Sequence, residues 1–239
     1  MASSFAPDLQ FIGPPLSDGP LPAIFYFALS AHDSLHLDPF NQPVEAWKKH
    51  PVRVFSIDLP AHGPGEDKME AMSIWAKQLT HDPVGYFEPF FFRFGEVLKE
   101  LTPYIDADNI AVAGLSRGGF IATHLAARFP AIKSVLGFAP ATKLIELKGF
   151  PSEASQHDLV HLIPKLKHIT LKFYIGNHDI LVNTQDAWEF CRDLAEHKFQ
   201  NGERSPQVYF SMYPSIGHRG HGTPPGVFQE GAQWLITQG

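Results

Sequence analysis

Residues 108–120 read Asp-Asn-Ile-Ala-Val-Ala-Gly-Leu-Ser-Arg-Gly-Gly-Phe, and the organisation of the chain is best understood from them. A short apolar run at 110–113 leads directly into Gly-Leu-Ser-Arg-Gly at 114–118, and a helical segment begins at Gly119. Glycines on both sides permit a turn so sharp that the serine hydroxyl stands free above a sheet. We therefore expect a strand, a strained turn and a helix, with Ser116 as a nucleophile.

The same alternation of strand and helix extends along the chain. Apolar runs of four to eight residues, typical of strands that are buried on both faces, alternate with segments of helical period. The runs are Ala23–Leu29, Val52–Ile57, Ile110–Ala113, Ser134–Phe138, Ile169–Ile175 and Val208–Met212. The expected helices are Met72–Gln78, Tyr86–Leu98, Gly119–Arg128, Thr184–His197 and Val227–Thr237. This pattern predicts an α/β fold: a mostly parallel sheet with helices on both faces.

The length of 239 residues fits one domain of this class, which we place at 23–239. Residues 1–22 are rich in proline and weakly patterned, so we expect an N-terminal surface arm there. The segment 141–166 has unclear periodicity and is expected to be a small lid or a crossover insertion. Extra residues at 197–206 are expected to form an extended surface loop.

The composition excludes several classes of protein. Hydrophobic residues make up 44% of the chain and charged residues 18%, which argues against intrinsic disorder. The net charge of −6, without any block of like charges, predicts no basic surface that would bind nucleic acid or an anionic membrane. A lone cysteine, Cys191, excludes an internal disulfide and a cysteine-rich zinc site. No signal peptide or membrane-length apolar run is recognisable, so we expect a cytoplasmic protein.

Two motifs carry a resemblance to a known family. The turn around Ser116 and the sequence Asp-Leu-Pro-Ala-His-Gly at 58–63 together resemble the α/β-hydrolase superfamily, over the chain from Ala23 to Gly239. The second motif is similar to the family's D-x-P-G-H-G loop, with Ala61 where glycine is usual. The resemblance implies the α/β-hydrolase fold and a structural role for this loop. His62 is therefore expected to be a packing and turn residue.

The resemblance also implies the order of a catalytic triad: serine, then acid, then histidine, each after a later strand. Asp179 lies in Gly-Asn-His-Asp after the run 169–175 and is the expected acid; Asp186, inside a predicted helix, is a weaker rival. His218 follows the run 208–212 and resembles the family's late Gly-His loop, so we expect it to be the base. His221, three residues on, is its close rival.

The site also needs donors for an oxyanion. The helix after the turn aims its first amides at the serine, so the backbone N–H of Arg117 is one expected donor. By position, Leu29 or Ser30 supplies the second; the absence of a His-Gly pair there argues against a lipase of the HGGG type. The Arg117 side chain is open to two interpretations, a partner for an acidic group of the substrate or a structural ion pair.

A run of phenylalanines at 87–94 is more apolar than one helix face requires. Phe87, Phe90, Phe91, Phe92 and Phe94 are expected mainly in the core, with an acyl pocket as the alternative.

These observations predict a serine hydrolase that cleaves carboxylic esters through an acyl-enzyme intermediate. The Gly-x-Ser-Arg-Gly-Gly form is similar to dienelactone-hydrolase-like and prolyl-oligopeptidase-like members, so a peptidase or amidase is the alternative. A binding protein with a vestigial triad is a third possibility. We expect a small-molecule ester as substrate, and neither a metal nor an organic cofactor.

Overall fold

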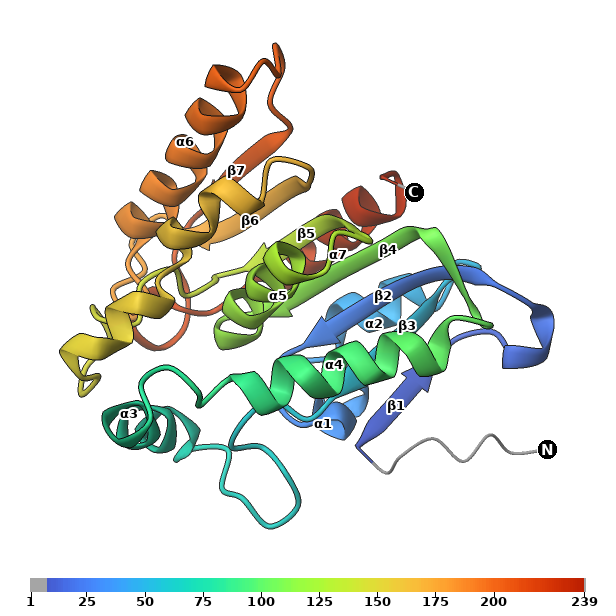
Figure 1. The fold of residues 1–239 in the computed structure, drawn as a ribbon, viewed down its shortest axis with the longest axis horizontal. Coiled ribbons are helices and arrows are strands. Elements are labelled where there is room, and N and C mark those ends of the chain that lie inside the picture. The colour runs from blue at the N-terminus through green and yellow to red at the C-terminus, as the bar shows by residue number, and fades with distance from the viewer. Residues whose placement is uncertain (1–7, 239) are drawn as a thin grey trace.

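The computed structural model describes residues 8–238, which are built around a seven-stranded sheet (Figure 1). The strand order is β1-β3-β2-β4-β5-β6-β7, and every pair is parallel except β1 with β3. The strands are β1 Leu9–Ile12, β2 Leu21–Phe27, β3 Arg53–Ile57, β4 Ile105–Leu115, β5 Ile132–Phe138, β6 Thr170–Gly176 and β7 Val208–Tyr213. The expected fold class, with all six predicted strands, is confirmed.

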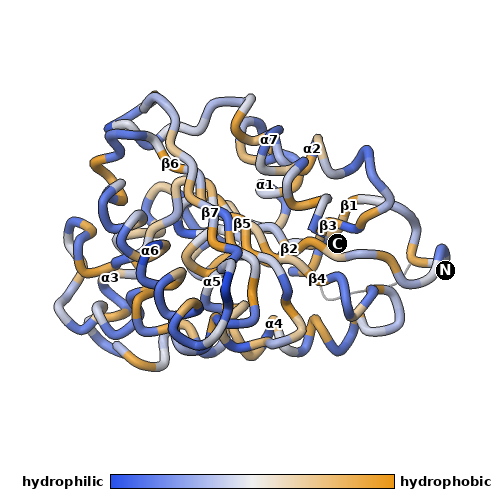
Figure 2. Tube along the Cα trace, turned by 90° about the horizontal axis from the view of Figure 1, so that it is seen from above, coloured by the Kyte–Doolittle hydropathy of each residue, from blue (hydrophilic) through white to orange (hydrophobic). Residues whose placement is uncertain are grey.

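Helices cover both faces of the sheet. One face carries α1 (Ala31–His36), α2 (Gln42–Trp47) and α7 (Pro225–Ile236), and the other carries α3 (Ala71–His81), α4 (Glu88–Leu101), α5 (Arg117–Arg128) and α6 (Thr184–Gln200). Figure 2 shows the strands between these two layers. Short 3₁₀ helices are η1 Leu16–Asp18, η2 Ser152–His157, η3 Leu159–Lys165 and η4 His218–Gly220. No helix within residues 8–238 has the length and apolar character needed to cross a bilayer.

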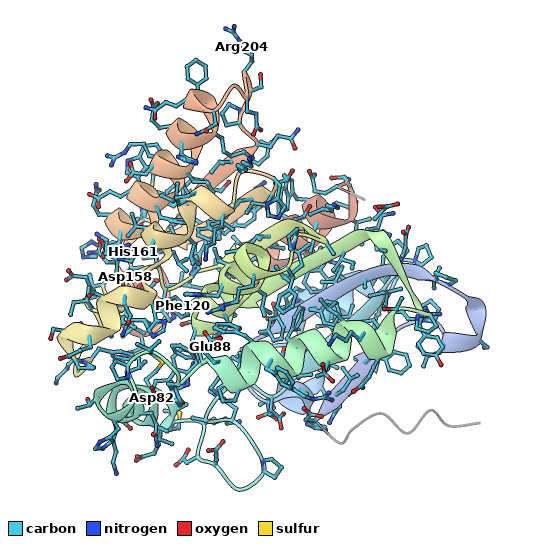
Figure 3. The ribbon with its side chains drawn as sticks, viewed as in Figure 1. Asp82, Glu88, Phe120, Asp158, His161 and Arg204 are labelled. Carbon is cyan, nitrogen blue, oxygen red and sulfur yellow. The ribbon has the colours of Figure 1, made fainter. Side chains whose placement is uncertain are left out.

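Aromatic side chains fill the core beneath β2 and β4. Phe120 of α5, labelled in Figure 3, contacts the rings of Trp75 and Phe87. The expectation that the phenylalanine run packs in the core is confirmed for Phe87, Phe90, Phe91 and Phe94, which are all buried, whereas Phe92 is 72% exposed. Each buried ring stabilises the fold by about 1.5–3 kcal/mol. The run thereby anchors α4 against the sheet.

The expected N-terminal arm is wrong where the structure describes it. Residues 9–12 form β1, which pairs antiparallel with β3, and only residues 1–7 of the arm lie outside the described part of the chain. Arg53, fully buried at the start of β3, holds the segment that follows β1. Its guanidinium donates to the carbonyl oxygens of Pro14, Pro15, Gly19 and Tyr104. The alternation rules missed β1 because its four residues are too few to show a period.

The segment 141–166 is the crossover from β5 to β6. It contains η2 and η3, and it is fastened to itself by two hydrogen bonds: Leu144 N–H donates to Asp158 Oδ1 at 2.7 Å, and Leu159 N–H to the Thr142 carbonyl at 2.9 Å. Leu144, Leu159 and Leu166 are fully buried. By topology, the segment connects two parallel neighbouring strands of the sheet.

Candidate active site

The turn between β4 and α5 holds Ser116 in a strained conformation. Its φ of 55° and ψ of −116° lie in a region that residues with a side chain rarely adopt. The neighbouring glycines have no space for a side chain: a Cβ on Gly114 would lie 2.1 Å from the Gly118 carbonyl carbon, and one on Gly118 would lie 1.9 Å from the Phe27 carbonyl oxygen. The Ser116 N–H donates to the Phe138 carbonyl at 2.8 Å. Tight packing thus forces the turn predicted from the sequence.

The acid lies after β6, as expected, in a turn that fixes one oxygen of its carboxylate. Asp179 Oδ1 accepts hydrogen bonds from the N–H groups of Leu181 at 2.9 Å and Val182 at 3.1 Å, which leaves Oδ2 for another partner. Thr184 closes the turn, because its hydroxyl accepts from the Asp179 N–H and donates to the Gly176 carbonyl. The rival Asp186 is instead ion-paired with Lys143 at 2.6 Å.

A histidine joins this acid to the serine, and it is His221. Its Nδ1 lies 2.7 Å from Asp179 Oδ2, and its Nε2 lies 2.9 Å from Ser116 Oγ. Because the carboxylate can only accept, Nδ1 carries the proton and Nε2 presents its lone pair to the serine hydroxyl. Three side chains separated by 63 and 42 residues in the sequence therefore form one hydrogen-bonded chain.

The charge state of Asp179 follows from its surroundings. Burial alone would raise the pKa of this carboxyl, but the hydrogen bond from His221, together with the amides of Val182 and Leu181, lowers it below its ordinary value. The carboxylate is thus ionised at neutral pH. An ionised carboxylate holds the imidazole in the tautomer that faces Ser116.

The expectation that His218 is the base is wrong. His218 begins η4, is exposed, and has no side-chain hydrogen bond within residues 8–238. After it the chain doubles back, so that residues 221 and 222 pair with Ile216, and the Gly222 N–H donates to the Ile216 carbonyl at 2.8 Å. Positive φ angles at Gly217, Arg219 and Gly220 make this reversal possible. The later histidine is therefore the one that returns to the end of the sheet.

Only one expected oxyanion donor combines a free amide with a place in the site. The Arg117 N–H, at the first position of α5, has no acceptor among residues 8–238. The Leu29 N–H is already used, since it donates to Ser34 Oγ at 3.0 Å. The Ser30 amide has no acceptor in the same part of the chain, but Ser30 does not line the cavity beside Ser116. Of the two positions expected for the second donor, Leu29 therefore has its amide occupied, because α1 begins after a short loop and places Ser34 on that amide.

Ser116 and His221 open onto a cavity of about 470 Å³. Its wall is mostly apolar and includes residues from several loops, from α3 and from α7, among them Phe40, Leu147, Phe150, Leu181 and Phe228. The phenylalanine run at 87–94 does not line it, so the acyl-pocket alternative for that run is wrong. The lining segments at 39–40 and 146–150 had no signal in the sequence beyond the irregularity of 141–166.

Comparison with solved structures identifies the fold. Est1E from Butyrivibrio proteoclasticus, solved with ferulic acid, aligns over 96% of this chain and 94% of its own, with a TM-score of 0.66 and 14% identity. TT1662 from Thermus thermophilus aligns over 96% and 92%, with a TM-score of 0.68 and 16% identity. This chain has the α/β-hydrolase fold. A putative dipeptidyl aminopeptidase IV from Bacteroides ovatus is also similar (TM-score 0.62, 15% identity), although this chain, at 96% coverage, spans only 33% of it.

No protein-family profile matches the sequence, and no curated protein is similar to it in sequence. The α/β-hydrolase fold is therefore recognised here through structure, while the site rests on the geometry of this chain itself.

The loop at 58–63 has the structural role expected of it in the α/β-hydrolase fold. Asp58 Oδ1 accepts from the Ala31 N–H at 2.7 Å, and His62 Nδ1 lies 2.9 Å from the Pro60 carbonyl. Ala61 adopts a φ of 61°, which explains why glycine is usual at its position. His62 is 3% exposed, and among the described residues it forms no hydrogen bond with Ser116 or Asp179. The loop thus ties β3 to the start of α1.

Proposed function

We propose that this chain is a serine hydrolase that cleaves carboxylic esters through an acyl-enzyme intermediate. One observation carries the proposal: a continuous hydrogen-bonded chain runs from Asp179 through His221 to a serine on a strained turn, beside an apolar cavity. Ser116 is the nucleophile, His221 the base and Asp179 the orienting acid in this proposal. Strain at the serine and a desolvated carboxylate are features that folding alone does not require.

The first half of the reaction forms the acyl-enzyme. Ser116 Oγ attacks the ester carbonyl carbon while His221 Nε2 takes its proton, and the carbonyl oxygen becomes an oxyanion near the Arg117 amide. The resulting imidazolium is stabilised by the Asp179 carboxylate at Nδ1. The C–O bond to the alcohol then breaks, and His221 gives the proton to the departing oxygen.

The second half repeats the steps with water. His221 takes a proton from a water molecule as its oxygen attacks the acyl carbon, and then returns a proton to Ser116 Oγ as the acid product leaves. The net reaction adds one water to one ester. No step requires another co-reactant.

The oxyanion site favours esters over amides. Of the expected oxyanion donors, only the Arg117 amide is both free among the residues described and placed in the site, whereas each donor is worth about 10²–10³ in kcat. Amide hydrolysis needs more stabilisation because the amine is a poorer leaving group. We therefore expect short p-nitrophenyl acyl esters to turn over faster than the matched anilides. A larger kcat/KM for the anilides would instead support the peptidase alternative.

A fluorophosphonate probe tests whether Ser116 is activated. The folded protein is expected to be labelled on Ser116, the Ser116→Ala variant to remain unlabelled, and His221→Ala to be labelled far more slowly. A folded wild-type protein that does not react would contradict the proposal and favour a binding protein with a vestigial triad. A panel of acyl esters of increasing chain length would then measure how deep an acyl chain the cavity accepts.

A further inference from the structure

The side chain of Arg117 has no partner in the protein. Arg117 follows the serine and is one of the residues that line the cavity. None of its guanidinium N–H groups meets an acceptor within residues 8–238, no carboxylate there lies within ion-pair distance, and Nη1 is shielded from solvent. The structural ion pair, one of the two interpretations open from the sequence, is therefore not formed.

Other arginines in the protein show what an occupied guanidinium looks like. Arg93 donates to Asp8 and Glu100, Arg128 donates to Glu88, and buried Arg53 is surrounded by backbone carbonyls. The fold thus supplies acceptors where an arginine is structural. At Arg117, the residue that follows the nucleophile and lines the cavity, it supplies none among the described residues.

Leaving this cation without a partner is unfavourable for folding, because desolvation of a charge is not offset by a counter-ion. Burial lowers the pKa of Arg117 to about 10, so the side chain is still cationic at neutral pH. Its titratable neighbour gives no compensation: burial, and the positive charge of Arg117, lower the pKa of His62 to about 4, which leaves that ring neutral. An anion from outside the protein would supply the missing charge.

The cavity favours a carboxylate over a phosphate as that anion. A guanidinium matches a planar carboxylate with two parallel hydrogen bonds, and one positive charge neutralises it completely. A phosphate dianion would retain a net negative charge against mostly apolar walls. The rim adds a weak attraction for anions, because Lys148 and Arg219 are exposed without an ion pair in the described chain, and Glu146 is the one acidic residue among the described residues that line the cavity.

We propose that Arg117 binds a carboxylate of the substrate, so that the preferred substrates are esters that carry a free carboxylate group. This inference rests on the proposed function, since it names the substrate class of the same site. The Arg117 backbone serves the oxyanion and its side chain, in this proposal, positions the substrate.

Matched substrate pairs test the preference. On the acyl side, the p-nitrophenyl monoester of adipic acid is compared with that of adipamic acid; on the alcohol side, 3-acetoxybenzoate is compared with 3-acetoxybenzamide. Each pair differs only in carboxylate against amide. The readout is the ratio of kcat/KM for the acid to that for the amide, and we expect at least one pair to give a ratio above about 10 in the wild type.

Variants assign the preference to one side chain. Arg117→Gln is expected to lower the ratio by about 10- to 100-fold, and Arg117→Lys by less, because the charge is kept and the fork is lost. Lys148→Gln is the matched control at the rim, and we expect it to change the ratio by less than about threefold and only at low salt. Because the ratio is taken within each variant, a general loss of activity does not affect it.

The outcomes separate the two proposals. A wild-type ratio near 1 for both pairs, or a high ratio unchanged in Arg117→Gln, overturns the carboxylate site while ester hydrolysis stands. If no ester is hydrolysed, calorimetric binding of both pairs to Ser116→Ala decides. Tighter binding of an acid, lost on adding Arg117→Gln, upholds the carboxylate site although the proposed function fails; equal binding of acid and amide overturns it.

Discussion

The elbow around Ser116 and the loop that carries His221 meet across 2.9 Å, yet different forces shape them. The elbow is held by contacts between backbone atoms, which leave no space for a Cβ at Gly114 or Gly118. The histidine loop lies at the surface and is held mainly by hydrogen bonds, among them Ser215 Oγ with the His178 N–H at 2.7 Å. The elbow therefore has a strict sequence signature, and the loop has a loose one.

The difference teaches where a short motif is reliable. A turn imposed by sterics admits few residue types, so its pattern identifies the serine from sequence alone. In a loop held by hydrogen bonds, a reversal of the chain can bring a different residue to the site, although the composition of the loop is unchanged. His218 and His221 illustrate this, because only the fold of the loop decides which of them reaches Ser116.

The largest effect expected separates these two histidines. His221→Ala should lower kcat for a p-nitrophenyl ester by about 10⁴- to 10⁶-fold, because nothing else takes the serine proton. His218→Ala should change kcat by less than about threefold, since that side chain is exposed and outside the cavity. Steady-state kinetics on both variants, with circular dichroism as a check on folding, provides the measurement. Comparable losses in the two would contradict the geometry of the loop.

Next in size is the steric test of the elbow. Gly118→Ala should lower the free energy of unfolding by about 4 kcal/mol or more, because the new Cβ meets the Phe27 carbonyl oxygen at 1.9 Å. Gly226→Ala is the control, since a Cβ there has nothing within 4 Å and helix α7 gains a better helix former. Urea denaturation measures both. A stability of Gly118→Ala close to that of Gly226→Ala would show that the elbow tolerates side chains.

A similar substitution in the histidine loop should affect activity more than stability. A Cβ on Gly220, which has a φ of +77°, would lie 2.2 Å from the His178 carbonyl oxygen, so Gly220→Ala should displace the loop and lower kcat/KM by about 100-fold. The free energy of unfolding should fall by only about 1–2 kcal/mol, because the loop is exposed. Gly202→Ala shares the positive φ without a clash and serves as control. If Gly220→Ala instead unfolded the whole protein, the histidine loop would be as important for stability as the elbow, which would contradict the comparison.

The smallest effect expected is the loss of stability at acidic pH that comes from Asp179. The pKa of Asp179 is lower in the folded protein than in the unfolded chain, so its ionised form stabilises the fold fully above about pH 3.8, and this contribution is lost as the pH falls further. Wild type should exceed Asp179→Asn by about 1.5–3 kcal/mol in unfolding free energy at pH 7. The difference should stay constant down to about pH 4 and shrink below it. A difference that grew on acidification would reverse the sign of the shift.

The six parallel strands, the five longer helices and the positions of Ser116 and Asp179 could be predicted from the sequence. Helices α1 and α2 were not predicted, because six residues each are too few to show a helical period. The second oxyanion donor and the cavity wall could not be predicted, because they depend on which distant loops meet. That Arg117 has no partner among the described residues could not be predicted either, because it depends on which side chains the fold brings near it.

Arg53 sets a practical limit on shortening this protein. Deleting residues 1–22, as their proline-rich composition invites, would strip an edge from the sheet and remove three of the four carbonyl groups that surround a wholly buried guanidinium. The donors left behind would have to be rehydrated or the strand displaced. Expression designs that trim the front of the chain should therefore stop before Leu9 or replace Arg53 with an apolar residue at the same time.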